Sequence, residues 1–171
     1  MSFIPDPETA PDPVTQLSAA ERAFYVRQLI LPEIGMAGQL KLKAARVAVL
    51  GAGGLGAPAL LYLAGAGVGE IIIIDDDSIE VSNLHRQVIH SYARAGNSKA
   101  ESAAETMRAL NPFITVTVIR ERLTDSNALT LLTGTDAVLD GSDNFEARYA
   151  VSAAVQQLGI PHIWAAILGF D

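Results

Sequence analysis

One stretch of the sequence, residues 46–77, joins two short apolar runs through a glycine-rich turn and an uncharged segment. The runs at 46–50 (RVAVL) and 71–74 (IIII) are typical of strands that are buried on both faces of a sheet. Between them, GAGGLG at 51–56 fits the pattern G-x-G-x-x-G, and residues 57–66 are mostly small or apolar. The order predicts a strand, a tight turn, a closely packed helix and a second strand that ends at Asp75-Asp76-Asp77.

This order of elements indicates a site for an anionic ligand. Glycines let the backbone approach a ligand closely, and the following helix directs its free N–H groups and positive dipole end at an anion, most often phosphate. Asp75 stands at the tip of the second strand, where a carboxylate can bind a ribose hydroxyl. A purely structural glycine turn is the alternative interpretation. We predict a nucleotide site that includes Gly51, Gly53, Gly54, Gly56 and Asp75.

Residues 47–69 carry no charge and are long enough to suit a membrane span. Glycines and Pro58 interrupt this stretch where a strand would pass into a helix. A spanning helix with such breaks would need other protein to satisfy its freed backbone groups. We therefore reject a membrane-spanning segment here.

The composition excludes several classes of site and partner. The chain of 171 residues has no cysteine, which excludes disulfides, cysteine nucleophiles and thiolate metal sites, and we expect no zinc within it. Its three histidines show no metal-ligand spacing. A net charge of −7 argues against nucleic acid as a partner. Proline and acidic residues stand where the apolar part of a signal peptide would be, so we expect a cytoplasmic protein.

Strand and helix patterns alternate along the chain, which predicts an α/β, Rossmann-like fold with a mostly parallel twisted sheet and helices on both faces. We expect a disordered or extended arm at 1–16, N-terminal helices at 17–45 and a Rossmann-like nucleotide-binding domain at 46–171. Helices are expected over 18–29, 36–44, 57–66, 98–110, 125–132 and 145–158, and strands over 46–50, 71–74, 113–121, 137–139 and 160–168. The last strand completes a Rossmann-type half, so we interpret the chain as the N-terminal portion of a longer protein.

Further polar residues follow the strands, at the ends where such sheets bind ligands. The long loop after the second strand contains Asn83, Arg86 and Gln87, Lys99 opens the next helix, and Asp143 follows the fourth strand. A triphosphate carries several negative charges, whereas a helix N-terminus offers only about half a positive charge. A site for a triphosphate would therefore need further cations: Arg86 and Lys99 could meet there, and Asp143 could add a metal ion. A loop salt bridge and a surface lysine are the alternative interpretations of the two cations.

Taken together, these motifs resemble the MoeB/ThiF family, the bacterial relatives of ubiquitin-activating enzymes. The resemblance covers about residues 18–171, and the order and spacing of the motifs make it specific. The matching stretches are Tyr25-Val26-Arg27-Gln28, GAGGLG at 51–56, Asp75-Asp76-Asp77, Asn83-Leu84-His85-Arg86-Gln87, Lys99 and Asp140-Gly141-Ser142-Asp143-Asn144.

The resemblance implies an adenylyltransferase that uses ATP and magnesium. Its partner would be a ubiquitin-like sulfur carrier protein of the MoaD or ThiS type that ends in Gly-Gly. The enzyme would adenylate the carrier's C-terminal glycine and release pyrophosphate, for molybdopterin or thiamin sulfur transfer. Asp143 would hold magnesium, and Arg27 would reach the site of a partner copy across a homodimer interface. The nucleotide-binding residues would be Gly51, Gly53, Gly54, Gly56, Asp75, Asn83, Arg86, Gln87 and Lys99, and the catalytic ones Arg27, Arg86, Lys99 and Asp143.

Two other functions stay open. The glycine motif also suits a NAD-dependent oxidoreductase, and the chain could be a non-catalytic ATP-binding or dimerisation module. Longer relatives in the family carry paired cysteines for zinc, which this chain lacks. Individual residues also have simpler interpretations: Arg27 pairs with Glu21 or is solvated, Asp140 caps the next helix, and Trp164 lies in the core.

Overall fold

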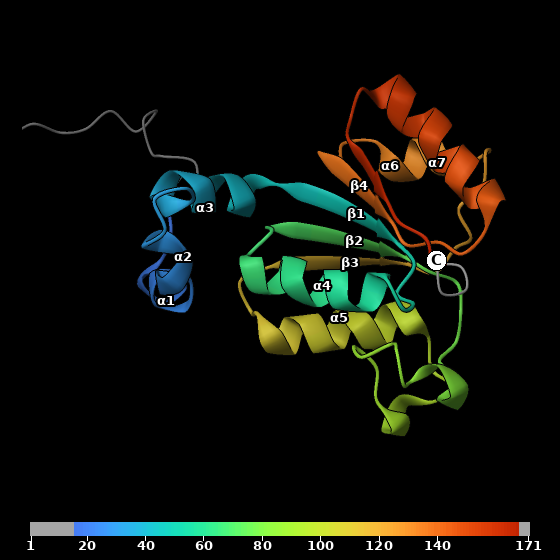
Figure 1. The fold of residues 1–171 in the computed structure, drawn as a ribbon. Coiled ribbons are helices and arrows are strands. Elements are labelled where there is room, and N and C mark those ends of the chain that lie inside the picture. Colours follow the sequence, from blue (N-terminus) through green and yellow to red (C-terminus); the bar gives the residue numbers. More distant parts are fainter. Residues whose placement is uncertain (1–15, 168–171) are drawn as a thin grey trace, which may run out of the picture.

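The chain forms a five-stranded sheet in the order β3-β2-β1-β4-β5, in which every pair of neighbours is parallel (Figure 1). The computed structural model describes residues 16–167. The strands are β1 Arg46–Leu50, β2 Glu70–Ile74, β3 Thr115–Ile119, β4 Ala137–Asp140 and β5 His162–Trp164. The predicted α/β, Rossmann-like fold is confirmed, and the parallel pairing follows from the helical crossovers between successive strands.

Two layers of helices cover the sheet. On one face lie α4 Gly56–Ala66 and α5 Lys99–Leu110, and on the other α6 Ala128–Leu132 and α7 Phe145–Leu158. Side chains alternate along β2, so that Ile71 and Ile73 join the first core and Ile72 and Ile74 the second. Burial on both faces therefore explains the run of four isoleucines. Within residues 16–167, no helix has both the length and the apolar character that a membrane span requires.

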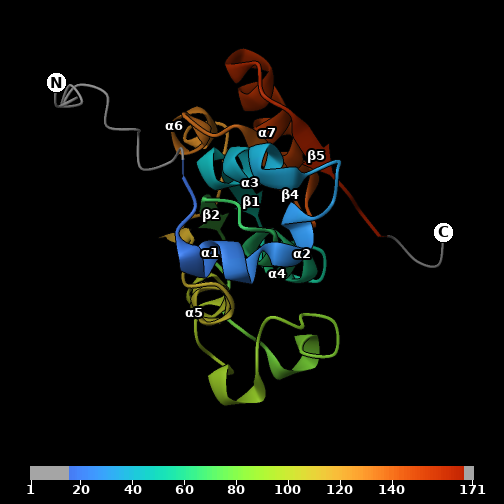
Figure 2. The same ribbon diagram turned by 90° about the vertical axis from the view of Figure 1, so that its left-hand side faces the viewer.

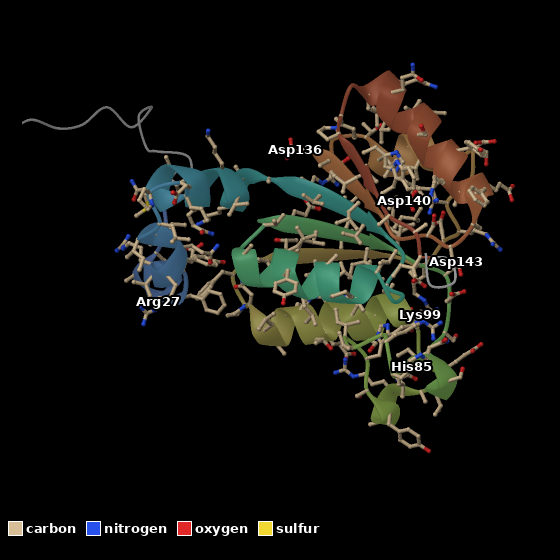
Figure 3. All side chains as sticks on the ribbon, in the orientation of Figure 1. Arg27, His85, Lys99, Asp136, Asp140 and Asp143 are labelled. Carbon is tan, nitrogen blue, oxygen red and sulfur yellow. The ribbon has the colours of Figure 1, made fainter. Side chains whose placement is uncertain are left out.

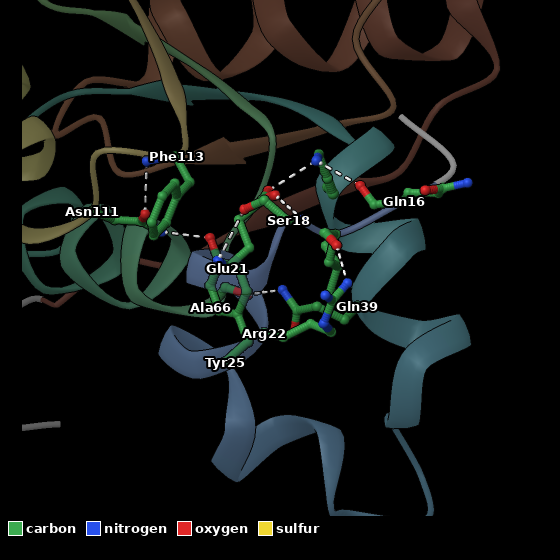
Figure 4. A network of polar contacts seen from close by, with 11 residues as sticks. Gln16, Ser18, Glu21, Arg22, Tyr25, Gln39, Ala66, Asn111 and Phe113 are labelled. Atoms are coloured by element: carbon green, nitrogen blue, oxygen red, sulfur yellow. Dashed lines mark hydrogen bonds and ion pairs between the residues drawn. The ribbon is translucent and has the colours of Figure 1, made fainter. Parts of the chain in front are cut away.

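The N-terminal helices lie beyond the amino ends of the strands, away from the ends where the strands finish (Figures 1 and 2). They are α1 Ala19–Phe24, α2 Val26–Leu29 and α3 Gly35–Ala44. Asn111 Nδ2 donates to the Tyr25 hydroxyl at 2.8 Å (Figure 4). The side-chain amides of Gln28 and Gln39 both donate to the carbonyl of Ala66, at 2.9 Å. These bonds fasten the N-terminal helices to the C-terminal ends of α4 and α5.

Two predicted helix boundaries are wrong. The helix expected over 18–29 is divided into α1 and α2 at Tyr25, whose side chain is buried and whose backbone, with φ −91° and ψ 11°, departs from the α-helical conformation. The helix expected over 125–132 begins only at Ala128. The carboxamide of Asn127 accepts a backbone N–H at 2.7 Å and closes a turn before that helix begins.

Two predicted strands are longer than the observed ones. The strand expected over 113–121 is limited to Thr115–Ile119, the residues that pair with β2. The strand expected over 160–168 is limited to His162–Trp164, the residues that pair with β4. In both cases the neighbouring strand sets the length of the ladder. Most of the arm expected at 1–16 lies outside the described residues.

Candidate nucleotide site

The glycine loop joins β1 to α4 with little room between them. Gly51 has a φ of +85°, and its N–H donates to the carbonyl of Ile74 at 2.9 Å. Gly56 begins α4 so close to the loop that a Cβ atom would lie 1.8 Å from the carbonyl oxygen of Gly51. The backbone therefore requires glycine at both positions. In the described part of the chain, the N–H groups of Gly53 and Gly54 donate to no protein acceptor.

Asp75 is buried at the end of β2 and holds the glycine loop. Its Oδ2 accepts the N–H of Ala52 at 2.7 Å, and its Oδ1 accepts the N–H of Asp77 at 2.9 Å. Burial raises the pKa of the Asp75 carboxyl, and these two N–H groups oppose that shift. Each carboxylate oxygen has more than one lone pair, so Asp75 can still accept hydrogen bonds from the hydroxyls of a ribose.

A pocket of about 590 Å³ lies at the carboxyl ends of the strands, where the strand order reverses between β1 and β4. Its size is that of a small-molecule site. Of the residues expected to contact a nucleotide or metal, those that line it are Gly51, Gly53, Gly54, Asp75, Arg86, Gln87, Lys99 and Asp143. Its apolar lining includes Leu50, Leu55, Ile74, Leu123 and Ala147. Gly56 and Asn83 are not among the lining residues.

The two predicted cations lie in this pocket, each with a polar neighbour. Lys99 Nζ lies 2.6 Å from Asp77 Oδ2. Lys99 is buried, so the interpretation as a surface lysine is wrong. Arg86 Nη2 donates to Asn83 Oδ1 at 2.9 Å, which orients the guanidinium and gives Asn83 its place near the site. Gln87 is buried, and its Oε1 has no partner within the described residues, so it is available to a ligand.

Asp143 extends from a turn after β4 that its neighbours hold in place. Asp140 is buried and accepts the N–H of Ser142 at 2.9 Å. Asn144, rather than Asp140, caps α7 by accepting the N–H of Ala147 at 2.8 Å. Asp143 is exposed at the pocket. Within residues 16–167 no three acidic, histidine or cysteine side chains form a metal cluster, and one free carboxylate suits Mg²⁺ held mainly by phosphate oxygens and water.

Arg148 is a pocket residue that the sequence analysis missed. Its Nη2 donates to the carbonyls of Ser142 at 3.1 Å and Ala165 at 3.4 Å, and its guanidinium carbon lies 4.8 Å from the centre of the Trp164 ring. It therefore ties the turn before α7 to the segment after β5. A signal was available, because the helix expected over 145–158 places Arg148 in its first turn, directly after the motif at 140–144. Trp164, on the edge strand β5, was expected in the core but is 58% exposed.

Arg27 lies at the opposite end of the molecule from the pocket. Figure 3 shows Lys99 and Asp143 at the carboxyl ends of the strands and Arg27 beyond their amino ends. Arg27 is exposed on α2. It does not pair with Glu21, which instead forms an ion pair with Lys43 at 2.8 Å. The pocket of one chain is therefore built without the Arg27 of that chain.

His90, one of the three histidines without metal-ligand spacing, is buried beside the glycine loop. Its Nε2 lies 3.0 Å from the carbonyl oxygen of Ala52, and its Nδ1 lies 3.1 Å from Ser102 Oγ. A carbonyl oxygen only accepts, so Nε2 carries the proton and Nδ1 accepts from the hydroxyl. Burial lowers the pKa of His90, and the nearby charges of Lys99 and Arg94 act in the same direction.

The lowered pKa of His90 predicts how stability depends on pH. The unfolded chain, in which His90 has a pKa of about 6.5, takes up the proton more readily than the folded chain. The contribution of His90 to the stability of the folded chain is therefore complete above pH 6.5, and it is lost as the pH falls through the pKa of His90 in the folded chain. We expect the free energy of unfolding to decrease from about pH 7 towards about pH 5, and less so in His90→Gln.

Urea unfolding of both proteins at several pH values measures this difference. The carboxyl of Asp75, whose raised pKa has the opposite sign, acts in both proteins and therefore cancels in the comparison. An equally steep dependence in the wild type and in His90→Gln would contradict the prediction.

The sequence matches the ThiF family over residues 25–171. It is 51% identical over 160 residues to a protein of Mycobacterium tuberculosis named probable adenylyltransferase/sulfurtransferase MoeZ. It is 49% identical over 147 residues to the sulfur carrier protein adenylyltransferase of Thermus thermophilus. These matches cover 94% and 86% of this chain but 41% and 54% of the two relatives. The chain thus spans about half the length of these curated relatives.

Solved structures resemble the fold closely. The E. coli tRNA N6-threonylcarbamoyladenosine dehydratase TcdA in complex with ATP has a TM-score of 0.86 at 30% identity, over 91% of this chain and 64% of that one. E. coli MccB with ATP has a TM-score of 0.69 at 34% identity, over 77% of this chain and 39% of that one. The family match covers most of the chain and agrees with its motifs and its sheet order. The chain therefore belongs to the ThiF family.

Proposed function

We propose that this chain binds ATP with Mg²⁺ and is the nucleotide-binding part of an enzyme that adenylates the C-terminal glycine of a ubiquitin-like sulfur carrier. The observation that carries the proposal is that a glycine loop, a buried carboxylate, two cations and a free carboxylate face one pocket. The names of the relatives and the ATP complexes of similar structures support it. The carrier would be of the MoaD or ThiS type, and the pathway would be molybdopterin or thiamin sulfur transfer.

Different pocket residues would bind different parts of the nucleotide. Asp75 would accept the ribose hydroxyls, and the free N–H groups of the glycine loop would face the phosphates. Because ATP brings several negative charges into an acidic protein, cations are also required. A cation 4 Å from a phosphate oxygen contributes about 4 kcal/mol before desolvation, at an effective dielectric constant near 20. Arg86 and Lys99 would supply this, and Mg²⁺ at Asp143 would neutralise further charge on the phosphates.

The reaction places few demands on acid–base chemistry. The carrier's C-terminal carboxylate would attack the α-phosphorus of ATP. A bond forms between a carboxylate oxygen and phosphorus, and the bond to the bridging oxygen of pyrophosphate breaks, so that pyrophosphate leaves with the electron pair. A C-terminal carboxyl has a pKa of about 3.5, so it is ionised and needs no base. Arg86 and Lys99 would therefore act by orienting the phosphates and stabilising their charge.

Arg27 would act on the pocket of a second copy in a homodimer. A swing of α2 into its own pocket would break the bond between Tyr25 and Asn111 and the bond from Gln28 to Ala66. In a twofold dimer, a contact between Arg27 of one copy and the partner's pocket is matched by the reverse contact, so both pockets would be completed together. This arrangement agrees with the resemblance to the family, in which the matching arginine crosses the dimer interface.

Replacing Lys99 tests the nucleotide site in particular. We expect Lys99→Met to weaken ATP binding by about 10- to 100-fold, because a charge-assisted hydrogen bond contributes about 1.5–3 kcal/mol. Stability should change little, since its partner Asp77 has a side chain that is 65% exposed and can be solvated by water. Calorimetry measures the affinity, and Lys41→Met, at an exposed position on α3, is the matched control. Equal affinity in Lys99→Met and wild type would contradict this role.

ATP–pyrophosphate exchange with Mg²⁺ and carrier proteins ending in Gly-Gly tests the function. Exchange that requires one carrier would support acyl-adenylation and identify the partner. ATP binding without exchange for any carrier would argue for a non-catalytic module. Tight binding of NADH with no binding of ATP would overturn the proposal in favour of a NAD-dependent oxidoreductase.

A further inference from the structure

The backbone of Ala52 is held from two sides by buried side chains. Its N–H donates to Asp75 Oδ2 at 2.7 Å, and its carbonyl oxygen accepts from His90 Nε2 at 3.0 Å. His90 is 8% exposed, and Ser102 Oγ on α5 fixes the other ring nitrogen. The two bonds set the orientation of both peptide groups next to this residue. No step of the proposed reaction uses His90, although it is buried against the loop that faces the phosphates.

The geometry of the peptide bond extends the effect of His90 to the next residue. The carbonyl of Ala52 and the N–H of Gly53 belong to one planar trans peptide group, so they point in opposite directions. With the carbonyl turned to His90, the N–H of Gly53 points away from the imidazole. Gly53 lines the pocket, and within residues 16–167 its N–H donates to no acceptor. Glycine at 53 and 54 leaves this peptide group few other restraints.

We infer that His90 is a positioning residue that fixes the peptide between Ala52 and Gly53 and so directs the Gly53 N–H toward the phosphates of the ligand. The inference rests on the proposed nucleotide site, and His90 itself touches no reacting atom. Without the bond from Nε2, this peptide group can rotate and turn a carbonyl oxygen toward the phosphates, which repels them. Loss of this hydrogen bond should therefore weaken binding of the phosphates and leave binding of the nucleoside unchanged.

Two polar substitutions at His90 separate the hydrogen bond from the fit of the side chain. In His90→Gln the amide nitrogen reaches the position of Nε2 and can donate to Ala52. In His90→Asn it reaches only the position of Nδ1, near Ser102. We expect His90→Asn to weaken ATP binding about ten-fold, the effect of one lost hydrogen bond, and His90→Gln to remain within about two-fold of wild type. Affinity for adenosine should be equal in all three proteins, as measured by NMR titration.

Thr135→Val is the control for a general loss of stability. It removes the buried hydrogen bond that Thr135 Oγ1 donates to the carbonyl of Leu132 at 2.8 Å, before the amino end of β4 and away from the pocket, so it should lower stability and leave ATP affinity unchanged. Equal ATP affinity in His90→Asn and wild type would overturn the inference, as would equal weakening of ATP and adenosine binding. Absence of ATP binding in the wild type would instead refute the proposed nucleotide site.

Discussion

An equal mixture of the Arg27→Ala and Asp143→Ala variants should recover about a quarter of wild-type adenylation. Each variant alone should lose at least about 100-fold in rate, since both side chains would stabilise charge in the transition state. Half of the dimers formed on mixing contain one chain of each kind. In such a dimer one pocket has an intact Asp143 and receives an intact Arg27 from the other chain, whereas the second pocket lacks both.

The same exchange assay supplies a matched control. Arg86 and Asp143 line the same pocket, so mixing Arg86→Ala with Asp143→Ala should restore nothing. Arg27 and Asp143 are both exposed, so neither substitution should alter folding. Recovery in the control mixture, or none in the mixture with Arg27→Ala, would contradict a site shared between two copies.

Gly56→Ala should lower the free energy of unfolding by about 3 kcal/mol or more. The added methyl group would lie 1.8 Å from the carbonyl oxygen of Gly51, and it meets backbone rather than a flexible side chain. Gly51 cannot easily move away, because its N–H is bonded to Ile74 and the next residue is bonded to Asp75. Either α4 or the glycine loop must shift, so ATP binding should be lost with stability.

Gly65 provides the comparison within the same helix. A Cβ atom there would meet nothing within 4 Å, so Gly65→Ala should raise stability by about 0.5–1 kcal/mol through helix propensity alone. Urea unfolding followed by circular dichroism measures both variants. A similar small effect for Gly56→Ala and Gly65→Ala would show that the contact between Gly56 and Gly51 does not limit the packing of α4.

The parts of the fold that the sequence predicts well depend on local pattern. The strands at 46–50 and 71–74 are aliphatic because both faces are buried, and the glycine loop follows its strand directly. The pocket lining was predictable because parallel strands end at one edge of a sheet, which brings together Asp75, Lys99 and Asp143 from distant positions.

The remainder depends on tertiary packing that a sequence pattern does not carry. His90 and Arg148 are known as neighbours of the pocket only once α5 and α7 are packed on the sheet. The expectation that Trp164 is a core residue fails for a similar reason. A side chain on an edge strand is buried only where other elements cover that face of the sheet. Val116 on the edge strand β3 is buried in the core with α4 and α5, whereas Trp164 on the edge strand β5 is exposed, and the sequence pattern does not show this difference.

The distance between α2 and the pocket has a consequence for regulation. Because Tyr25, Gln28 and Gln39 fasten these helices in place, a complete site in the proposed dimer exists only when two copies meet. Below the dissociation constant of the dimer, the number of complete sites rises with the square of the chain concentration. A two-fold change in expression would then change the adenylating capacity of the cell by about four-fold, without any dedicated regulatory ligand.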